Sequence, residues 1–533
     1  MSESIKYAID IHPKRAIVET DTNAGLPEQE TSVLTGTGLC IIMFMIGLYS
    51  TMDSVVFIPI ANHFNALSQA EWIINGYLIT TTAFQPIYGK ISDIVGRVPA
   101  ILFASTMLLI GSLVCAISQS LVVMIIGRAI QGLGTAGMFT MANVLVADLY
   151  SERARGKFMG LSSGVWSLAS SGGLVLGGVL VQFASWRVIF WLNLPISVII
   201  ATVVIYSIKL PKPSGTMRYK TKRVDFGGTV ISLLSIVLIL LALAWGGREY
   251  HWNSAIVICF LVFGVLTGAL FIFYEHRVPT EPIIPLHLLH TRNNVIALIA
   301  QLFFGSVANA PLFLVPKWAL LVKNTTPVTS GLYLLPYNLA EFAAVVVSGW
   351  WVTRTGRYRE CVWLGSTMLL VGLTPLIVLD QNSGLEIIIG FQIVAGMGFG
   401  VCIHSLLLTA QVNADGLDSA STTSVSMFMR SIGSITIVAV LGSVYGNKVN
   451  YMFAEVTRLY PEYADKIALI AENQTLIRKL DLPPAVYDLL VDAFMRSMRV
   501  AFIALIPFSV IFILLVASIK HKPLQVIKKM TIK

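Results

Sequence analysis

Long apolar runs alternate with short polar segments along almost the whole chain. Each run is long enough to supply the ~20 residues that a helix needs to cross the hydrocarbon core of a bilayer. We therefore expect each run to form a membrane-crossing helix. Fourteen runs meet this description, at residues 36–60, 71–90, 99–117, 121–148, 157–181, 186–208, 226–246, 253–275, 293–322, 327–352, 361–379, 385–411, 420–446 and 499–519.

The composition supports this interpretation. The chain has 533 residues, of which 56% are hydrophobic and 12% are charged, and its mean hydropathy is +0.77. Soluble domains usually contain ~25% charged residues, about twice this share. A soluble globular protein and a disordered chain are both excluded, because neither accommodates so much apolar surface. The sequence thus predicts an all-α membrane protein.

Neither the cysteines nor the glycine-rich segments predict a metal, a cofactor or an active site. The five cysteines lie in apolar stretches without CxxC spacing, so disulfides and zinc are not expected. Gly132–Gly137 fits the pattern GxGxxG, but it lies inside a predicted membrane helix and follows no strand. The sequence also contains no GxxxxGK[ST] motif and no nucleophile–base set. We expect no cofactor, no metal, no catalysis and no nucleic-acid partner.

The distribution of basic residues predicts the topology. The net charge is +9, and an even number of helices places both termini on one side of the membrane. Most Lys and Arg residues then fall on the same side as the termini. The positive-inside rule identifies that side as cytoplasmic, so both tails, 1–35 and 520–533, are expected in the cytoplasm. The N-x-[ST] sequons at Asn324 and Asn473 fall in non-cytoplasmic loops and are candidate N-glycosylation sites.

Two sequence motifs occur twice, in the same order and at nearly the same spacing. Gly89–Arg97 and Gly349–Arg357 carry glycines and a basic residue at the same offsets, 260 residues apart. Arg128–Gly134 and Gln392–Gly398 form a second pair, 264 residues apart. These repeats predict two homologous six-helix halves, an arrangement typical of transporters.

The repeat divides the chain into segments. The two six-helix bundles are expected at 36–208 and 293–519, the second with a long lumenal loop at 447–497. A basic cytoplasmic linker at 209–225 and two inserted helices at 226–275 lie between them. The inserted pair raises the expected number of helices from twelve to fourteen.

The repeated motifs closely resemble those of the major facilitator superfamily. The family's first cytoplasmic motif, a gate by this resemblance, is matched by Gly89, Asp93, Gly96 and Arg97. Its fourth-helix motif is matched by Arg128, Gln131, Gly132 and Gly134. The resemblance implies the major facilitator fold, with two six-helix bundles plus two extra central helices, and transport by alternating access.

Further segments narrow the resemblance. Met52-Asp53-Ser54 is similar to the helix-one motif of fourteen-helix drug:proton antiporters, and residues 186–195 resemble that subfamily's sixth-helix signature. Residues 82–90 resemble fungal members that include vacuolar basic amino acid transporters. Leu174 stands where the antiporter motif of helix five has proline, so proton antiport is left open by the resemblance.

Small residues recur along the predicted helix at 157–181. Gly156, Gly160 and Gly164 are four residues apart, and such a face lets another helix approach closely. We assign a helix-packing role to the glycines of this helix, namely Gly164, Gly173, Gly177 and Gly178.

Four titratable residues inside predicted helices are candidates for the proton and substrate pathway. Asp53 and Arg128 lie at matching depths, ~10 Å from the outer ends of their helices. Asp53 is expected to bind a proton or a cation with Arg128 as its switchable partner, and a static ion pair is the alternative. Glu341 is a candidate for binding an ammonium or guanidinium group, unless it pairs with a neighbour such as Lys317. His404 suits proton coupling, unless it is a packing histidine.

The sequence predicts a proton-coupled secondary transporter that does no chemistry on its substrate. The resemblance and the intramembrane carboxylates favour basic amino acids (Lys, Arg and His) carried into the vacuole. The chain is expected to be a monomer. Its expected partners are a small cationic substrate, protons and the lipid bilayer. Arg430 is expected to make a structural contact. The alternatives to transport of basic amino acids are a multidrug:proton antiporter at the plasma membrane, a siderophore transporter and a non-transporting nutrient receptor.

Overall fold

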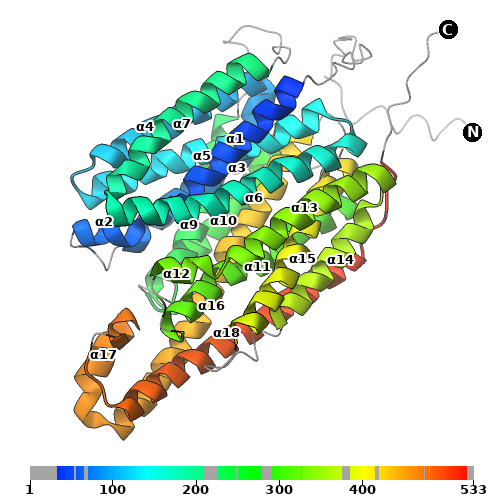
Figure 1. Cartoon of the computed structure of the whole chain (residues 1–533). Coiled ribbons are helices and arrows are strands. Elements are labelled where there is room, and N and C mark those ends of the chain that lie inside the picture. Colours follow the sequence, from blue (N-terminus) through cyan, green and yellow to red (C-terminus); the bar gives the residue numbers. More distant parts are fainter. Residues whose placement is uncertain are drawn as a thin grey trace, which may run out of the picture.

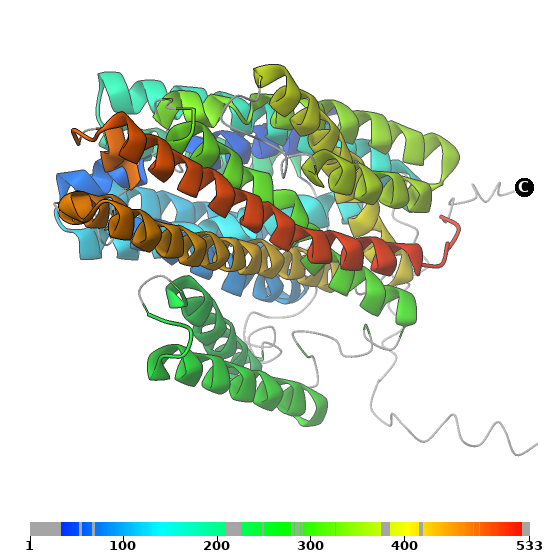
Figure 2. The same cartoon turned by 90° about the horizontal axis from the view of Figure 1, so that it is seen from below.

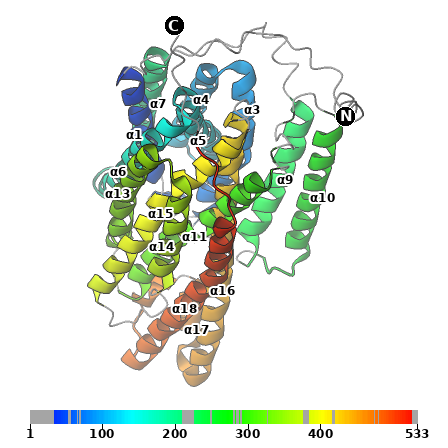
Figure 3. The same ribbon diagram turned by 90° about the vertical axis from the view of Figure 1, so that its right-hand side faces the viewer.

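The architecture is a set of long helices that run side by side (Figure 1). The computed structural model describes residues 33–524 apart from 53–55, 65, 67–69, 209–224, 248–249, 279–281, 283–287, 289–290, 324, 326, 375–383, 415–418, 473 and 479. No strand occurs among these residues. The start of α1 and the end of α18 lie at one end of the helices, which we call the terminal end. The opposite end, where α17 lies, is called the distal end (Figure 3).

The helices follow the predicted order. The first part of the chain forms α1 (Val33–Met52), α2 (Phe57–His63), α3 (Ala70–Val95), α4 (Arg97–Ile117), α5 (Leu121–Leu149), α6 (Glu152–Phe183) and α7 (Trp186–Ser207). The inserted pair is α9 (Phe226–Trp245) and α10 (Ala255–Arg277). The last part forms α11 (Arg292–Leu321), α12 (Pro327–Leu332), α13 (Leu335–Thr355), α14 (Tyr358–Leu373), α15 (Leu385–Asn413), α16 (Ser419–Leu459), α17 (Ala464–Glu472) and α18 (Pro484–Ala517).

Within the described ranges, twelve helices are long and apolar enough to cross a membrane. Two further predicted crossings correspond to α3 and α14. The first has many polar residues along its 26 positions, and the second has only 16 residues. Both lie among the membrane-length helices, so the structure agrees with an integral membrane protein of about fourteen crossings.

Repeated glycines end helices at equivalent points. Gly96 separates α3 from α4 with φ 115°, and Gly356 ends α13 with φ 73°. Positive φ values are easily adopted only by glycine, because it has no Cβ. Both copies of the motif therefore place a glycine with positive φ at the terminal end, although the ψ values of the two glycines differ, 156° at Gly96 and 3° at Gly356.

The apolar core is divided between the two parts of the chain. The largest buried cluster takes all its residues from α11 onward, and the second takes most of its residues from α1, α3, α4, α5, α6 and α7. Leu407, Ala420 and Met427 join the second cluster from the other half. The inserted pair lies beside the two bundles, at the edge of the molecule (Figure 2).

The predicted lumenal loop at 447–497 is much shorter in the structure. Helix α16 continues to Leu459 and α18 begins at Pro484, so both helices extend well beyond their expected ends. Phe453 and Val456 of α16 pack in the same buried cluster as Val486 and Leu490 of α18. This mutual burial stabilises the extra turns, which hydropathy alone assigned to a loop.

The segment that follows α18 is tied to the terminal end of the second half. The hydroxyl of Tyr358 donates to the carbonyl of Lys522 and accepts from its amide, both at 3.0 Å. Asn293 makes the same two kinds of bond to Lys520, at 2.9 and 3.1 Å. The Lys522 ammonium donates to the Val412 carbonyl at 2.7 Å. Residues 518–524 thus join the ends of α11, α14 and α15, and we call them the C-terminal strap.

We expect Tyr358→Phe to loosen the C-terminal strap. The change removes two hydrogen bonds of a buried side chain, each of which contributes about 1 kcal/mol. Trypsin should then cut faster after Lys520, as followed by mass spectrometry of the purified chain. Tyr206→Phe, at a 71% exposed side chain, is the control and should leave the cleavage rate unchanged. Equal rates in all three proteins would contradict this role of Tyr358.

Candidate functional site

The two halves meet closely at the terminal end along α6 and α13. A Cβ added at Gly349 of α13 would collide with the carbonyl of Gly156 and lie 3.1 Å from the Cα of Gly160. A Cβ at Gly160 would lie 2.8 Å from the carbonyl of Val345. The helices can approach this closely because both carry glycine at the crossing. Further along α6, Gly164 faces Val346 of α13.

A second contact between the halves joins α3 to α16. A Cβ at Gly89 would collide with the Ser424 side chain and lie 3.1 Å from the carbonyl of Ala420. Half-way along the helices, the Ser431 hydroxyl donates to the Gln85 amide oxygen at 3.0 Å. Both seams are therefore closed on the terminal side of the molecule.

A charged cluster lies inside the second half, on three different helices. Glu341 of α13 and His404 of α15 are only 4% and 6% exposed. Arg430 of α16 interacts electrostatically with both of them. In the described part of the chain, one carboxylate oxygen of Glu341 and both ring nitrogens of His404 have no hydrogen-bond partner. Proton coupling and a packing role both remain predictions for His404.

Arg430 connects this cluster to the first half. Its guanidinium lies 5.7 Å from the ring centroid of Phe139 on α5, within reach of a cation–π interaction. The Phe139 ring is in turn 6.2 Å from that of Trp166 on α6. The predicted alternative partner of Glu341, Lys317, lies over the Tyr445 ring at 3.8 Å. Glu341 instead interacts electrostatically with Arg430, which the sequence analysis had treated as structural. An isolated arginine within an apolar helix was the signal for this residue.

Arg128 is held within the first half. Its guanidinium donates to the Gln131 amide oxygen at 2.8 Å and to the Ile73 carbonyl at 3.1 Å, and it lies 4.4 Å from the Tyr77 ring centroid. Gln131 extends this network to Ser112 on α4 with a bond of 3.0 Å. Three helices are therefore joined through one buried cation. Its predicted partner Asp53 lies outside the described residues.

The gate motif forms an ion-pair network at the terminal end. The Arg97 guanidinium is 2.5 Å from a carboxylate oxygen of Asp93 and 2.7 Å from one of Asp148 at the end of α5. It also donates to Ser92 at 2.7 Å. Arg97 thus connects the start of α4 to the ends of α3 and α5 through ion pairs. The repeat counterpart Arg357 has a much more exposed pair with Glu360, at 3.5 Å.

We expect Arg97→Gln to destabilise the terminal end of the first half. Hydrogen bonds to charged groups contribute about 1.5–3 kcal/mol each, and the carboxylates of Asp93 and Asp148 would lose their shared cation. The thermal midpoint of the purified protein should fall by several degrees. Arg357→Gln is the matched control at the repeat position, where an exposed pair contributes about 0–1 kcal/mol. Equal shifts for the two variants would contradict the assignment.

The remaining predicted residues fall into two groups. In the helix-packing motif, Gly173 of α6 lies against the Leu48 carbonyl of α1, and the same helix carries Gly177 and Gly178. Outside the described residues lie the sequon residues Asn324 and Asn473. The side chain of Leu174 is also not described.

Comparison with known protein families identifies the family of this chain. The model of the Major Facilitator Superfamily matches residues 39–437. The chain belongs to this superfamily. Members of this superfamily are transporters, so the two helical halves described above are those of a transporter.

The similar proteins include several fungal exporters. The efflux pump dotC of Dothistroma septosporum is 33% identical over 424 residues, which cover 80% of this chain and 72% of the pump. The MFS-type efflux pump LUC4 of Fusarium is 28% identical over 520 residues, covering 95% of this chain and 92% of that protein. Among solved structures, a bacterial homologue of the human lysosomal transporter Spinster has a TM-score of 0.57 at 15% identity, covering 92% of this chain and 98% of that one. This last likeness concerns the fold alone.

Proposed function

We propose that this protein is a proton-coupled exporter of small organic molecules. The observation that carries the proposal is the electrostatic interaction of buried Glu341 with Arg430, whose guanidinium lies over the Phe139 ring of the opposite half. Glu341 supplies a carboxylate that can bind and release a proton. Arg430 balances the negative charge of this carboxylate when the proton has been released. The similarity to several fungal efflux pumps supports export as the activity.

The same pair argues for a drug-like substrate over basic amino acids. A lone buried carboxylate would favour a cation, because an isolated charge is costly within a membrane. Here Arg430 already compensates Glu341, and a lysine or arginine substrate would have to displace it. Phe139 and Trp166 offer aromatic surfaces instead, which suit flat apolar molecules. The multidrug alternative of the sequence analysis therefore becomes the preferred hypothesis.

In the proposed cycle, Glu341 carries the coupling proton and Arg430 responds to it. Protonation of the carboxylate weakens its attraction for the guanidinium, and release of the proton restores it. Arg430 also contacts Phe139, so a change at Glu341 reaches the opposite half. His404, and Arg128 with Asp53, remain further candidates for proton binding.

We further propose that the terminal end faces the cytoplasm and that the protein lies in the plasma membrane. Arg97, Arg155, Arg357 and Lys522 all lie at the terminal end of the molecule. Positive residues near helix ends favour the cytoplasmic side.

The proposal is tested with the purified chain in proteoliposomes under an imposed pH gradient. Movement of uncharged aromatic compounds that depends on the gradient, without movement of labelled lysine, arginine or histidine, is the expected result. Gradient-driven uptake of lysine alone would favour the amino acid transporter instead. Absence of flux for both classes, in protein with an unchanged thermal midpoint, would overturn the transporter assignment for these substrates.

A further inference from the structure

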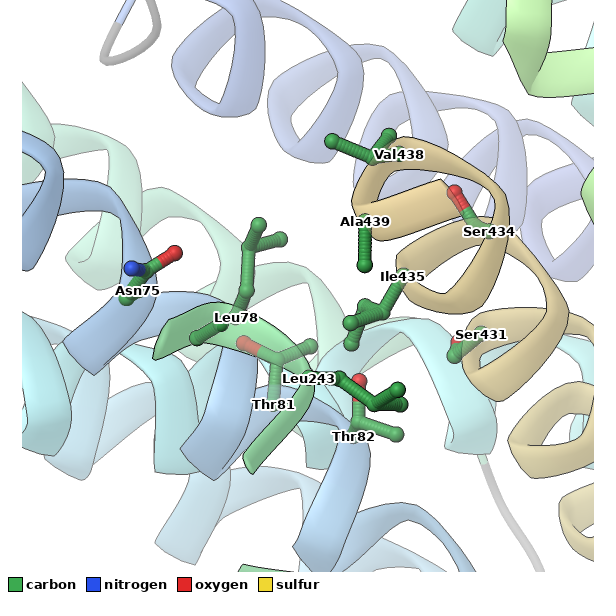
Figure 4. Close-up of a pocket in the computed structure, with 11 residues that line it drawn as sticks. Asn75, Leu78, Thr81, Thr82, Leu243, Ser431, Ser434, Ile435, Val438 and Ala439 are labelled. Atoms are coloured by element: carbon green, nitrogen blue, oxygen red, sulfur yellow. The ribbon is translucent and has the colours of Figure 1, made fainter. Parts of the chain in front are cut away.

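A cavity lies at the α3–α16 seam, on the distal side of the Gln85–Ser431 hydrogen bond. Its volume is about 170 Å³, and we call it the side pocket. Leu78 and Thr82 of α3 face Ile435 and Ala439 of α16 across it, and Leu243 of α9 lies beside Thr82 (Figure 4). The wall thus comes from both halves and from the inserted pair.

The size of the side pocket limits what it can hold. A cavity of about 150 Å³ is enough for benzene, whereas sites that enclose a whole drug-sized ligand measure about 300–1,000 Å³. The side pocket of about 170 Å³ therefore fits one ring-sized group. A larger molecule would place only one of its groups there.

The lining determines the chemistry of that group. No charged side chain lines the side pocket. The hydroxyls of Thr81 and Ser431 already have partners, the Gly132 carbonyl at 3.2 Å and Gln85 at 3.0 Å. By contrast, the side chains of Thr82 and Ser434 have no hydrogen-bond partner among the described residues, although Thr82 is only 2% exposed. Buried polar groups normally have partners, so these hydroxyls are available to a polar ligand atom.

The inserted pair is attached to both halves at the side pocket. The ring of Trp245, at the end of α9, lies 5.6 Å from that of Trp72 on α3. On the other side, the Trp252 indole donates to the Ser443 hydroxyl of α16 at 2.7 Å. Gly247, with φ 74°, allows the turn between these two contacts. Leu243 is therefore held at the seam by a segment that contacts both halves.

We propose that the side pocket binds one uncharged, ring-sized group that carries a hydroxyl, and that Leu243 of the inserted pair helps to select it. The apolar wall takes the ring, and Thr82 and Ser434 take the hydroxyl. Cationic groups are disfavoured there, because no carboxylate lines the cavity. The proposal rests on the proposed export function for its physiological meaning, since it names neutral hydroxylated ring compounds as the substrate class.

Binding of labelled 2-naphthol to the full chain in nanodiscs tests the site without any transport. Leu243→Trp should fill the pocket and weaken saturable 2-naphthol binding at least tenfold. Leu234→Trp is the matched control, because this α9 side chain is 50% exposed and lies away from the pocket. Unchanged binding in Leu243→Trp, or equal losses in both variants, would overturn the proposal.

A second variant tests the hydroxyl recognition. Wild-type protein should prefer 2-naphthol to naphthalene, since a site built to bond a hydroxyl rejects an analogue without one. Thr82→Val with Ser434→Ala should abolish this preference and retain naphthalene binding. A preference that survives both substitutions would overturn the assignment of these hydroxyls. Binding that is intact in a chain with no proton-driven flux would contradict the export function and leave the side pocket supported.

Discussion

Gly349→Leu is expected to abolish most of the transport activity. The new side chain would enter the α6–α13 crossing, where a Cβ already meets the carbonyl of Gly156 and the Cα of Gly160. Extra methylenes in a packed contact cost about 1–3 kcal/mol. A penalty of this size, borne only by the state with a closed terminal end, shifts the equilibrium by about 5- to 150-fold. The measurement is the gradient-driven export rate per molecule of folded protein.

A glycine on the neighbouring helix supplies the control for Gly349→Leu. A Cβ at Gly390 of α15 would meet nothing within 4 Å, and this residue is exposed. Gly390→Leu should therefore leave the export rate close to that of the wild type. A Gly349→Leu variant that exports at the wild-type rate would contradict the requirement for close approach at this seam.

Glu341→Gln is expected to remove the proton-driven part of transport. Glutamine keeps the size of the side chain but cannot release a proton, so the field at Arg430 no longer changes during the cycle. Substrate exchange without a gradient should continue, whereas export driven by a pH gradient should fall at least about tenfold, as expected for loss of a functional intramembrane carboxylate. Both rates can be measured in the same proteoliposomes.

The Glu341→Gln experiment needs a test of folding, because loss of one buried partner leaves Arg430 uncompensated. Removing one member of a buried pair typically costs about 3–5 kcal/mol. Glu341→Gln combined with Arg430→Gln removes both charges and should recover the thermal midpoint without recovering driven export. Glu360→Gln, at an exposed carboxylate of α14, is the control. Full driven export in Glu341→Gln would show that another residue carries the proton.

The region around Glu341 and Arg430 and the side pocket differ in charge but lie next to each other on α16. Glu341 and Arg430 form a charged region inside the second half, whereas the side pocket at the α3–α16 seam is lined without charge. Ser431 follows Arg430 directly and lines the pocket, so one turn of α16 belongs to both regions. A substrate group in the side pocket would therefore lie beside the residue that responds to the proton.

The sequence by itself determined the all-helical fold class, the order of the apolar helices and their approximate number. Apolar runs of membrane length can satisfy their backbone polar groups only as helices in lipid, so their positions along the chain predicted the fold class. The duplicated Gly89–Arg97 motif likewise predicted two related halves, because the turns at Gly96 and Gly356 require residues that tolerate positive φ. Glu341 and His404 could also be recognised from the sequence. An ionisable side chain within a membrane-length apolar run costs free energy, so such residues are rare there and indicate a candidate site.

Only the tertiary structure decided which of these residues meet. Arg430 and Glu341 are 89 positions apart in the sequence, and nothing in either helix favours this pairing over Lys317. The side pocket also depends on three segments that are distant along the chain, and hydropathy treats α9 as one more apolar run. The end of α16 and the start of α18 were misplaced because the last turns of α16 and the first turns of α18 are stabilised by packing against each other. Hydropathy reports what each segment prefers locally, whereas partners, cavities and helix ends depend on contacts made after the segments have come together.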